Sequence, residues 1–161
     1  MTRHSEILQE VVRILVREHP VIGVACHGSV LLGRARPDSD LDLIILVDAP
    51  GEYHNDHDAT FEGITLCRSF FPKEWLERTL EERPYTLWPF SRARILYDTD
   101  GAMAAYQAAA SAYFDRKPEI AAAWVERERN YRARKTDPSV DLAHPSWGEF
   151  FEWLRDNFDV T

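Results

Sequence analysis

The feature that most constrains this chain is a pair of aspartates, Asp40 and Asp42, at the start of an apolar run that ends at Val47. A short apolar run of this kind is typical of a buried strand. Side chains alternate between the faces of a strand, so both carboxylates lie on one face, about 6–7 Å apart along the chain. Mg²⁺ prefers carboxylate oxygens, and this separation suits the paired ions of phosphoryl transfer. The sequence therefore predicts a divalent metal site where a strand over 41–47 begins.

A Gly28-Ser29 pair follows another apolar run, over 21–26, and precedes Asp40 by ten intervening residues. Gly28 would let the backbone approach a phosphate closely. We expect Ser29 to cap a short helix over 30–34, whose first amides would point at an anion. The alternative is a plain helix-to-strand turn with aspartates at the surface. That alternative leaves the shared face of the two acids unexplained.

Together, Gly-Ser, ten residues and Asp-x-Asp on a strand resemble the DNA polymerase β-like nucleotidyltransferases, most closely their minimal and aminoglycoside-modifying members. Further matches are Gly33, Ala35, Pro37 and the Ser39-Asp40 pair. The resemblance covers roughly the first hundred residues. It implies an α/β (α+β) fold, with a small mixed sheet flanked by helices. We therefore expect a nucleotidyltransferase-like domain over 1–100 and a helical segment over 101–161 packed on it.

The resemblance also implies an activity, the transfer of a nucleoside monophosphate from an NTP, with ATP the expected donor, to an acceptor hydroxyl. Pyrophosphate would be released. By the same resemblance, Asp40 and Asp42 are the catalytic metal ligands for two Mg²⁺ ions, and Gly28 and Ser29 hold the β- and γ-phosphates. The expected acceptor is a small-molecule or protein hydroxyl.

One departure from the family pattern concerns the third carboxylate, which the family carries on a later strand as the base toward the acceptor. Here that place reads Ile64-Thr65-Leu66-Cys67, and neither Thr65 nor Cys67 can do a carboxylate's work. Glu62 is the first candidate for the base. Asp98 is a later candidate, although we interpret it mainly as a cap for the helix that follows.

A second departure is the absence of basic residues just after Gly-Ser, where this chain has Val30 and Leu32. Arg34 and Arg36 could supply the charge toward the triphosphate instead, or they could be solvated turn residues. Arg36 and Ser39 are our further candidates for nucleotide binding.

The missing carboxylate also supports a second hypothesis from another class. On that hypothesis the chain binds a nucleotide without catalysing transfer, as a regulatory module of the antitoxin-like kind that partners another protein.

The rest of the chain reads as alternating elements. We expect a packing helix over 5–18, a polar loop over 48–58, one strand over 60–71 with a bend at Gly63, and a helix over 72–83. A strand over 93–98 and helices over 102–114, from 118 toward 136, and over 146–158 follow. The aromatic segment 85–90 is interpreted as a satellite core, and His54 and His57 as members of a solvated loop rather than metal ligands.

The net charge of −8 argues against nucleic acid and acidic membranes as partners. No apolar run reaches the roughly 20 residues of a membrane span, and the first residues lack the apolar core of a signal peptide, so we expect a cytoplasmic protein. Cys26 and Cys67 lie in apolar runs and are expected in the core. The aromatic last helix makes a homodimer a reasonable expectation.

Overall fold

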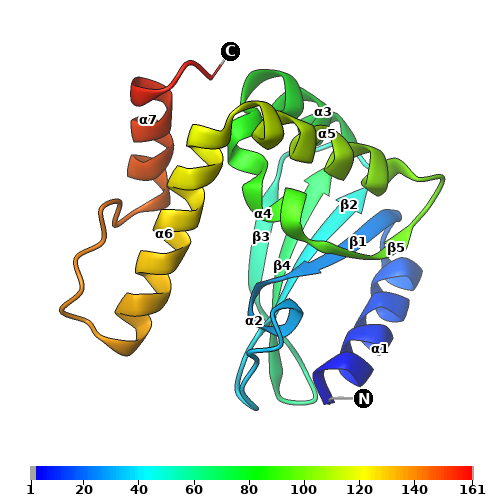
Figure 1. The fold of residues 1–161 in the computed structure, drawn as a ribbon. Helices are drawn as coiled ribbons and strands as arrows, with labels where there is room; N and C mark the ends of the chain where they lie inside the picture. Colours follow the sequence, from blue (N-terminus) through cyan, green and yellow to red (C-terminus); the bar gives the residue numbers. More distant parts are fainter. Residues whose placement is uncertain (1–2, 161) are drawn as a thin grey trace.

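The fold is built on a five-stranded mixed sheet, seen in a computed structural model that describes residues 3–160 (Figure 1). The strand order is β3-β4-β2-β1-β5; β2 and β4 are parallel, and the other neighbours are antiparallel. The strands are β1 (Val21–His27), β2 (Leu41–Val47), β3 (His54–Phe61), β4 (Ile64–Pro72) and β5 (Arg94–Asp98). The helices are α1 (Arg3–Glu18), α2 (Gly28–Leu31), α3 (Lys73–Glu82), α4 (Trp88–Arg92), α5 (Ala102–Arg116), α6 (Pro118–Thr136) and α7 (Trp147–Asn157), and a 3₁₀ turn, η1 (Pro84–Leu87), precedes α4. The expected α/β class is confirmed.

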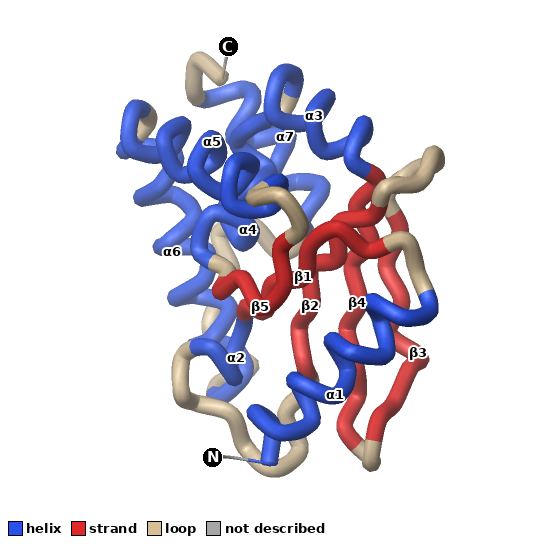
Figure 2. The backbone as a smooth tube through the Cα atoms, turned by 90° about the vertical axis from the view of Figure 1, so that its right-hand side faces the viewer, coloured by secondary structure: helices blue, strands red, loops and turns tan. Residues whose placement is uncertain are grey.

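Helix α1 covers one face of the sheet (Figure 2). Its apolar residues recur at helical spacing and are buried: Ile7, Leu8, Val11 and Leu15. They pack against alternate residues of β2, beginning with Leu41 and Leu43. Because side chains alternate along a strand, Asp42 between these two must lie on the other face.

That other face is covered by α3, α4 and α5, which form a second core with β1 and β2 (Figure 2). Leu76 of α3, Phe90 of α4 and Met103 of α5 are buried against Ile44 and Leu46. Asp42 shares the face of Ile44 and Leu46 but comes first along β2. It therefore lies at the end of this helical layer rather than beneath it.

The last two helices, α6 and α7, build a third core that is rich in aromatic side chains (Figure 1). Trp124 of α6 is buried and donates from Nε1 to the carbonyl oxygen of Tyr85 at 2.8 Å. Phe150 and Leu154 of α7 complete this core. The prediction that the aromatic segment 85–90 forms a satellite core is confirmed for Tyr85 and Trp88, whereas Leu87 and Phe90 belong to the second core.

Two predictions about the middle of the chain are wrong. The segment 48–58 is not entirely a loop, because its end opens β3, and 60–71 is not one strand. Instead β3 and β4 form a hairpin with a turn at Glu62 and Gly63. Every residue of β3 is exposed or half-buried, as at the edge of a sheet, so the strand carries no apolar signal in its sequence.

Within residues 3–160, no helix has both the length and the apolar character needed to cross a membrane.

Candidate functional site

The site begins where β1 ends and the chain turns at Gly28 against Asp42. β1 and β2 pair antiparallel, with His27 opposite Asp42, so the turn after His27 lies beside the start of β2. Gly28 has φ +77, and a Cβ atom placed on it would lie 2.0 Å from Oδ2 of Asp42. No side chain fits there. The glycine is therefore required by the close approach of the turn to the carboxylate as well as by its backbone conformation.

Asp40 and Asp42 are brought together as the sequence predicts, with Cys67 as a third member of the group. One ligand atom from each of the three residues lies within 4.8 Å of the others, and in residues 3–160 no other group of three or more such side chains meets this criterion. The parallel register sets Cys67 of β4 opposite Asp42 of β2. The Cys67 thiol donates to Oδ2 of Asp40 at 3.3 Å.

The expectation that both cysteines are core residues is correct for Cys26 and wrong for Cys67. Cys26 is fully buried among apolar side chains, and burial raises the pKa of its thiol to about 11. Cys67 is only half-buried, and its side chain lies beside the two aspartates. The apolar neighbours of Cys67 in the sequence conceal this, because they belong to a strand whose alternate residues face the opposite core.

The electrostatics of the group favour binding of a cation. Burial, followed by the negative charge of Asp40, raises the pKa of Asp42 to about 6. Burial and the hydrogen bond to Asp40 raise the pKa of the Cys67 thiol to about 12, so without a metal the thiol stays protonated at neutral pH. A divalent cation would relieve the repulsion between the two carboxylates.

Two further groups act on Asp42 from distant parts of the chain. Lys135 lies near the end of α6 and His57 lies on β3, and positive charge on either lowers the pKa of Asp42. From the sequence, His57 is interpreted as part of a solvated loop, and the basic end of α6 mainly as a solvated helix face. The basic run at the end of α6 is visible in the sequence, but its position near Asp42 depends on tertiary packing.

His27 stands between β1 and α2, and burial lowers the pKa of its imidazole to about 4. It is therefore neutral at pH 7 and does not contribute a positive charge to the site.

Helix α2 differs from the predicted helix over 30–34 in its position and in its cap. It spans Gly28–Leu31, and His27 rather than Ser29 precedes it, with no side chain capping the first amides. Ser29 instead lies within the turn, where its carbonyl oxygen accepts a hydrogen bond from the backbone of Arg34 at 2.9 Å. The prediction that Ser29 caps a helix is wrong because the helix starts two residues earlier, at the left-handed Gly28.

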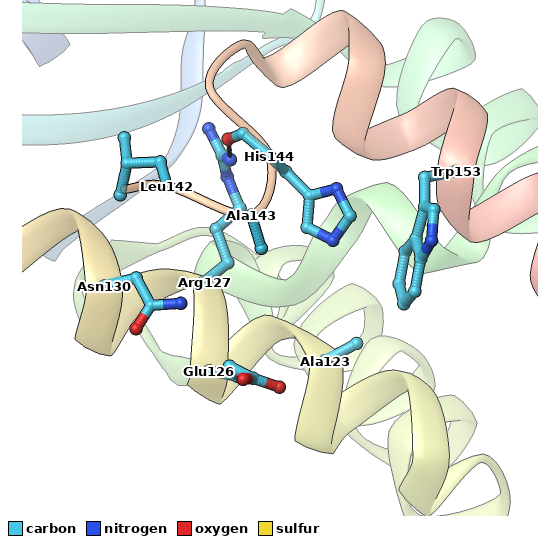
Figure 3. A pocket seen from close by; sticks show the side chains of 8 residues that line it. All are labelled: Ala123, Glu126, Arg127, Asn130, Leu142, Ala143, His144 and Trp153. Carbon is cyan, nitrogen blue, oxygen red and sulfur yellow. Dashed lines mark hydrogen bonds between the residues drawn. The ribbon is translucent and has the colours of Figure 1, made fainter. Parts of the chain in front are cut away.

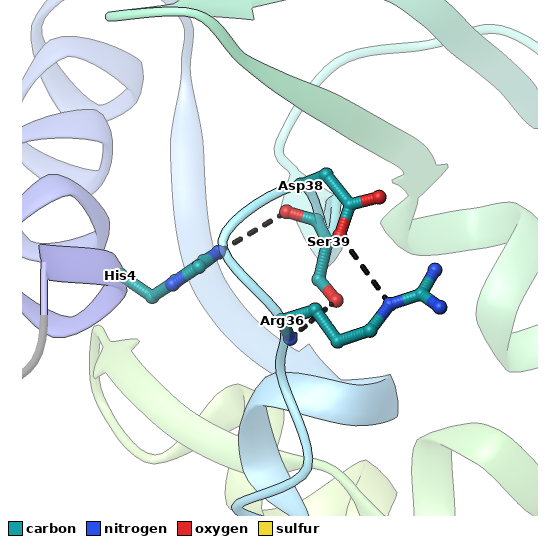
Figure 4. A network of polar contacts seen from close by, with 4 residues as sticks. All are labelled: His4, Arg36, Asp38 and Ser39. Carbon is teal, nitrogen blue, oxygen red and sulfur yellow. Dashed lines mark hydrogen bonds and ion pairs between the residues drawn. The ribbon is translucent and has the colours of Figure 1, made fainter.

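The loop before Asp40 is held by hydrogen bonds that involve the predicted Arg36 and Ser39 (Figure 4). The Ser39 hydroxyl accepts from the backbone amide of Arg36 at 2.9 Å. The buried His4 of α1 lies with Nε2 3.1 Å from the carbonyl oxygen of Ser39. The Arg36 side chain is exposed and pairs with Asp38 at 3.3 Å. In this arrangement Ser39 positions the loop, and Arg36 extends into solvent.

Glu62 is not brought to the acidic pair. It lies exposed in the turn of the β3–β4 hairpin, with φ 48, and its carbonyl oxygen accepts from Arg3 at 2.7 Å. Glu62 lies five positions before Cys67 in the sequence, and a strand rises about 3.3 Å per residue. The candidacy of Glu62 assumed one continuous strand, and the hairpin turn removes that assumption.

Asp98 acts as the cap that the sequence predicts. Its two carboxylate oxygens accept from the backbone amides of Met103 and Ala104, each at 2.9 Å. Both carboxylate oxygens are therefore committed to the first turn of α5.

Comparison with known proteins gives one family. A family model described as "Nucleotidyltransferase domain" matches residues 8–94, a range that holds the Gly28 turn, both aspartates and Cys67. Among solved structures, a nucleotidyltransferase-like protein from Exiguobacterium sibiricum 255-15 is similar at 11% sequence identity and a TM-score of 0.49. The match covers 81% of this chain and 47% of that one, so the chain spans about half the length of the solved protein. No curated protein matches the chain in sequence.

Proposed function

The chain belongs to the nucleotidyltransferase domain family, and on that premise we propose that it transfers a nucleoside monophosphate from an NTP, with ATP as the donor, to an acceptor hydroxyl. The observation that carries the proposal is the convergence of Asp40 and Asp42 beside the Gly28 turn. A turn that opens with a glycine next to two carboxylates can accommodate a phosphate chain and the cation that accompanies it. The acceptor we propose is a small-molecule or protein hydroxyl.

Two of the three side chains in the group suit a magnesium ion. Asp40 and Asp42 offer the oxygens that Mg²⁺ prefers, whereas Cys67 offers a sulfur that suits softer metals. Asp40 and Asp42 would therefore hold the Mg²⁺. When bound, Mg²⁺ neutralises charge on the phosphates.

The surrounding residues would bind and orient the triphosphate. Gly28 and Ser29 are proposed to hold the β- and γ-phosphates, because the absence of a Cβ on Gly28 lets this turn pack directly against the Asp42 carboxylate. Lys135 already acts on Asp42 and would supply a positive charge to the same place. Arg36 is the other candidate for this charge, and its side chain is exposed and paired with Asp38.

The proposed reaction also requires removal of the proton from the acceptor hydroxyl, and no residue is assigned to this step. Cys67 occupies the place opposite Asp42 on the neighbouring strand, and its raised pKa keeps the thiol protonated at neutral pH, so it cannot take up the proton. Glu62 lies in the hairpin turn. This observation supports the second candidate function, a regulatory module that binds a nucleotide and transfers it slowly or not at all.

The experiment is a transfer assay with NTP labelled at the α-phosphate, Mg²⁺, and amino-sugar and protein acceptors. Catalysis predicts labelled acceptor and free pyrophosphate with the wild type, and loss of both in Asp42→Asn. The matched control is Asp38→Asn, because Asp38 is exposed and paired only with Arg36.

A second variant, Cys67→Asp, separates the two candidate functions. If the chain is a binding module that lacks only a base, Cys67→Asp should gain transfer activity that the wild type lacks. Unchanged wild-type activity in Asp42→Asn would contradict the catalytic proposal. No activity in either wild type or Cys67→Asp, together with retained nucleotide binding, would favour the module.

A further inference from the structure

A second feature of the chain that calls for a ligand is the buried arginine Arg127 on α6. Its side chain is among the few charged ones in the interior, with 5% of the residue exposed. Nη1 donates to the carbonyl oxygen of His144, and Nε is buried without a hydrogen-bond partner. None of the ion pairs found among residues 3–160 includes it. A guanidinium removed from water in this way has an unmet demand for an anion.

The aromatic side chains around Arg127 compensate only part of its charge. The guanidinium carbon lies 4.0 Å from the centre of the Trp147 ring and 5.0 Å from that of Phe150. Such contacts are favourable, but they do not supply the acceptors that five N–H groups require. Burial lowers the pKa of Arg127 from its ordinary value, and arginine nevertheless remains charged at neutral pH.

Arg127 lines a cavity of about 280 Å³ between α6, the link over 137–146 and α7 (Figure 3). Ala123 and Asn130 lie on the α6 wall, and on the opposite side the rings of His144 and Trp153 pack against each other, with centroids 4.3 Å apart and planes tilted by 43°. Water takes about 30 Å³ per molecule, so the cavity has room for roughly nine waters. That is more than a halide ion needs and suits a small organic molecule.

The cavity is separate from the acidic pair. Lys135, whose charge reaches Asp42, comes eight residues after Arg127 on α6. At 1.5 Å per residue, this places the two side-chain origins about 12 Å apart along the helix. The family model ends at residue 94 and does not include the cavity.

We propose that this cavity binds a small organic carboxylate, with its carboxylate group on Arg127 and its flat apolar body against His144 and Trp153. The planar guanidinium matches a carboxylate in shape and charge. Glu126 at the cavity wall repels any anion, and it repels a dianion such as a phosphate monoester more strongly than a singly charged carboxylate. The inference does not depend on the proposed nucleotide transfer.

The test uses the ¹⁵N-labelled full-length chain and follows the Nε–H resonance of Arg127 by NMR. Sodium benzoate is the probe, and benzamide is the neutral molecule of the same shape. We expect a saturable shift of the Arg127 resonance with benzoate and an affinity at least tenfold lower for benzamide. Equal binding of the two molecules, or no saturable shift with benzoate, would overturn the proposal.

Two variants keep Arg127 in place, because the link over 137–146 depends on its hydrogen bond to His144. Ala123→Leu narrows the cavity from the α6 wall and should weaken benzoate binding at least tenfold. Arg155→Gln removes an exposed arginine of α7, which pairs with Asp156 outside the cavity, and should leave the affinity within twofold of wild type. Unweakened binding by Ala123→Leu would mean that benzoate binds elsewhere, and would also overturn the proposal.

Discussion

Replacing Gly28 with alanine is expected to disable the site by displacing Asp42. The new Cβ would lie 2.0 Å from Oδ2 of Asp42, far inside van der Waals contact. The turn is fixed by the pairing of His27 with Asp42, so the carboxylate has to move rather than the backbone. A substitution that adds one methyl group would therefore rotate a proposed metal ligand out of the group.

The expected magnitude combines two costs. A residue with a Cβ in the left-handed region costs about 1–2 kcal/mol, and an off-rotamer Asp42 adds about 0.5–1.5 kcal/mol. Gly28→Ala should therefore lower the free energy of unfolding by about 2–3 kcal/mol. Gly33→Ala is the matched control, because Gly33 has φ +64 and nothing lies within 4 Å of its added Cβ. Gly33→Ala should therefore lose only the backbone contribution of about 1–2 kcal/mol.

The assay is denaturant unfolding together with calorimetric titration of a non-hydrolysable ATP analogue in the presence of Mg²⁺. Gly28→Ala should lose at least tenfold in affinity, about 1.4 kcal/mol, whereas Gly33→Ala should bind within twofold of wild type. The additional destabilisation in Gly28→Ala should shrink in an Asp42→Ala background, where the clash is absent. Equal effects of Gly28→Ala and Gly33→Ala on affinity would refute this reasoning.

Three other predictions follow from the same contacts. Because the pKa of Asp42 is raised in the folded protein, its charge destabilises the fold as the pH rises from about 4 through 6. Asp42→Asn should therefore stabilise the metal-free protein at pH 8 and not at pH 4. Urea unfolding at both pH values measures this difference. Asp98→Ala removes the cap of α5 and should cost about 1–2 kcal/mol in thermal unfolding without changing nucleotide affinity; a loss of affinity would contradict its role as a cap. Lys135→Gln should weaken binding of the ATP analogue about threefold to tenfold, and more at low salt than at high salt. The neighbouring Arg134→Gln should not weaken it. Equal effects of the two changes would count against a specific role for Lys135.

The elements that the sequence predicts well are those with a strong local pattern. Helix α1 has apolar residues at helical spacing, and β2 is apolar through to Val47, so both were expected within two residues of their observed bounds. Asp40 and Asp42 share one face because side chains alternate between the two faces of a strand, and this follows from the sequence alone. For that reason the centre of the site could be located before any tertiary information was available.

The β3–β4 hairpin could not be predicted from an apolar pattern. β3 begins His54-Asn55-Asp56-His57-Asp58, and as an edge strand it has no face buried deeply enough to select apolar residues. Its pairing with β4 supplies the structure that its own sequence does not indicate. The prediction of one continuous strand over 60–71 also places Glu62 on a strand face, whereas Glu62 lies in the hairpin turn.

The remaining site residues depend on contacts between distant segments. Cys67 meets Asp42 through the parallel register of β2 and β4, and a parallel register cannot be read from either strand alone. Lys135 reaches Asp42 through the packing of α6, whose sequence shows only a mixed-charge end. The burial of Arg127 depends likewise on the link and on α7.

The most direct test of the central claim is calorimetric titration of a non-hydrolysable ATP analogue into the protein, with and without Mg²⁺. The variants are the double substitution Asp40→Asn/Asp42→Asn and, as the control, Asp38→Asn. The account predicts binding that requires Mg²⁺, disappears in the double variant and persists in the control. Absence of binding by the wild type, or binding that is indifferent to the double substitution, would contradict the claim that these two carboxylates form a nucleotide site.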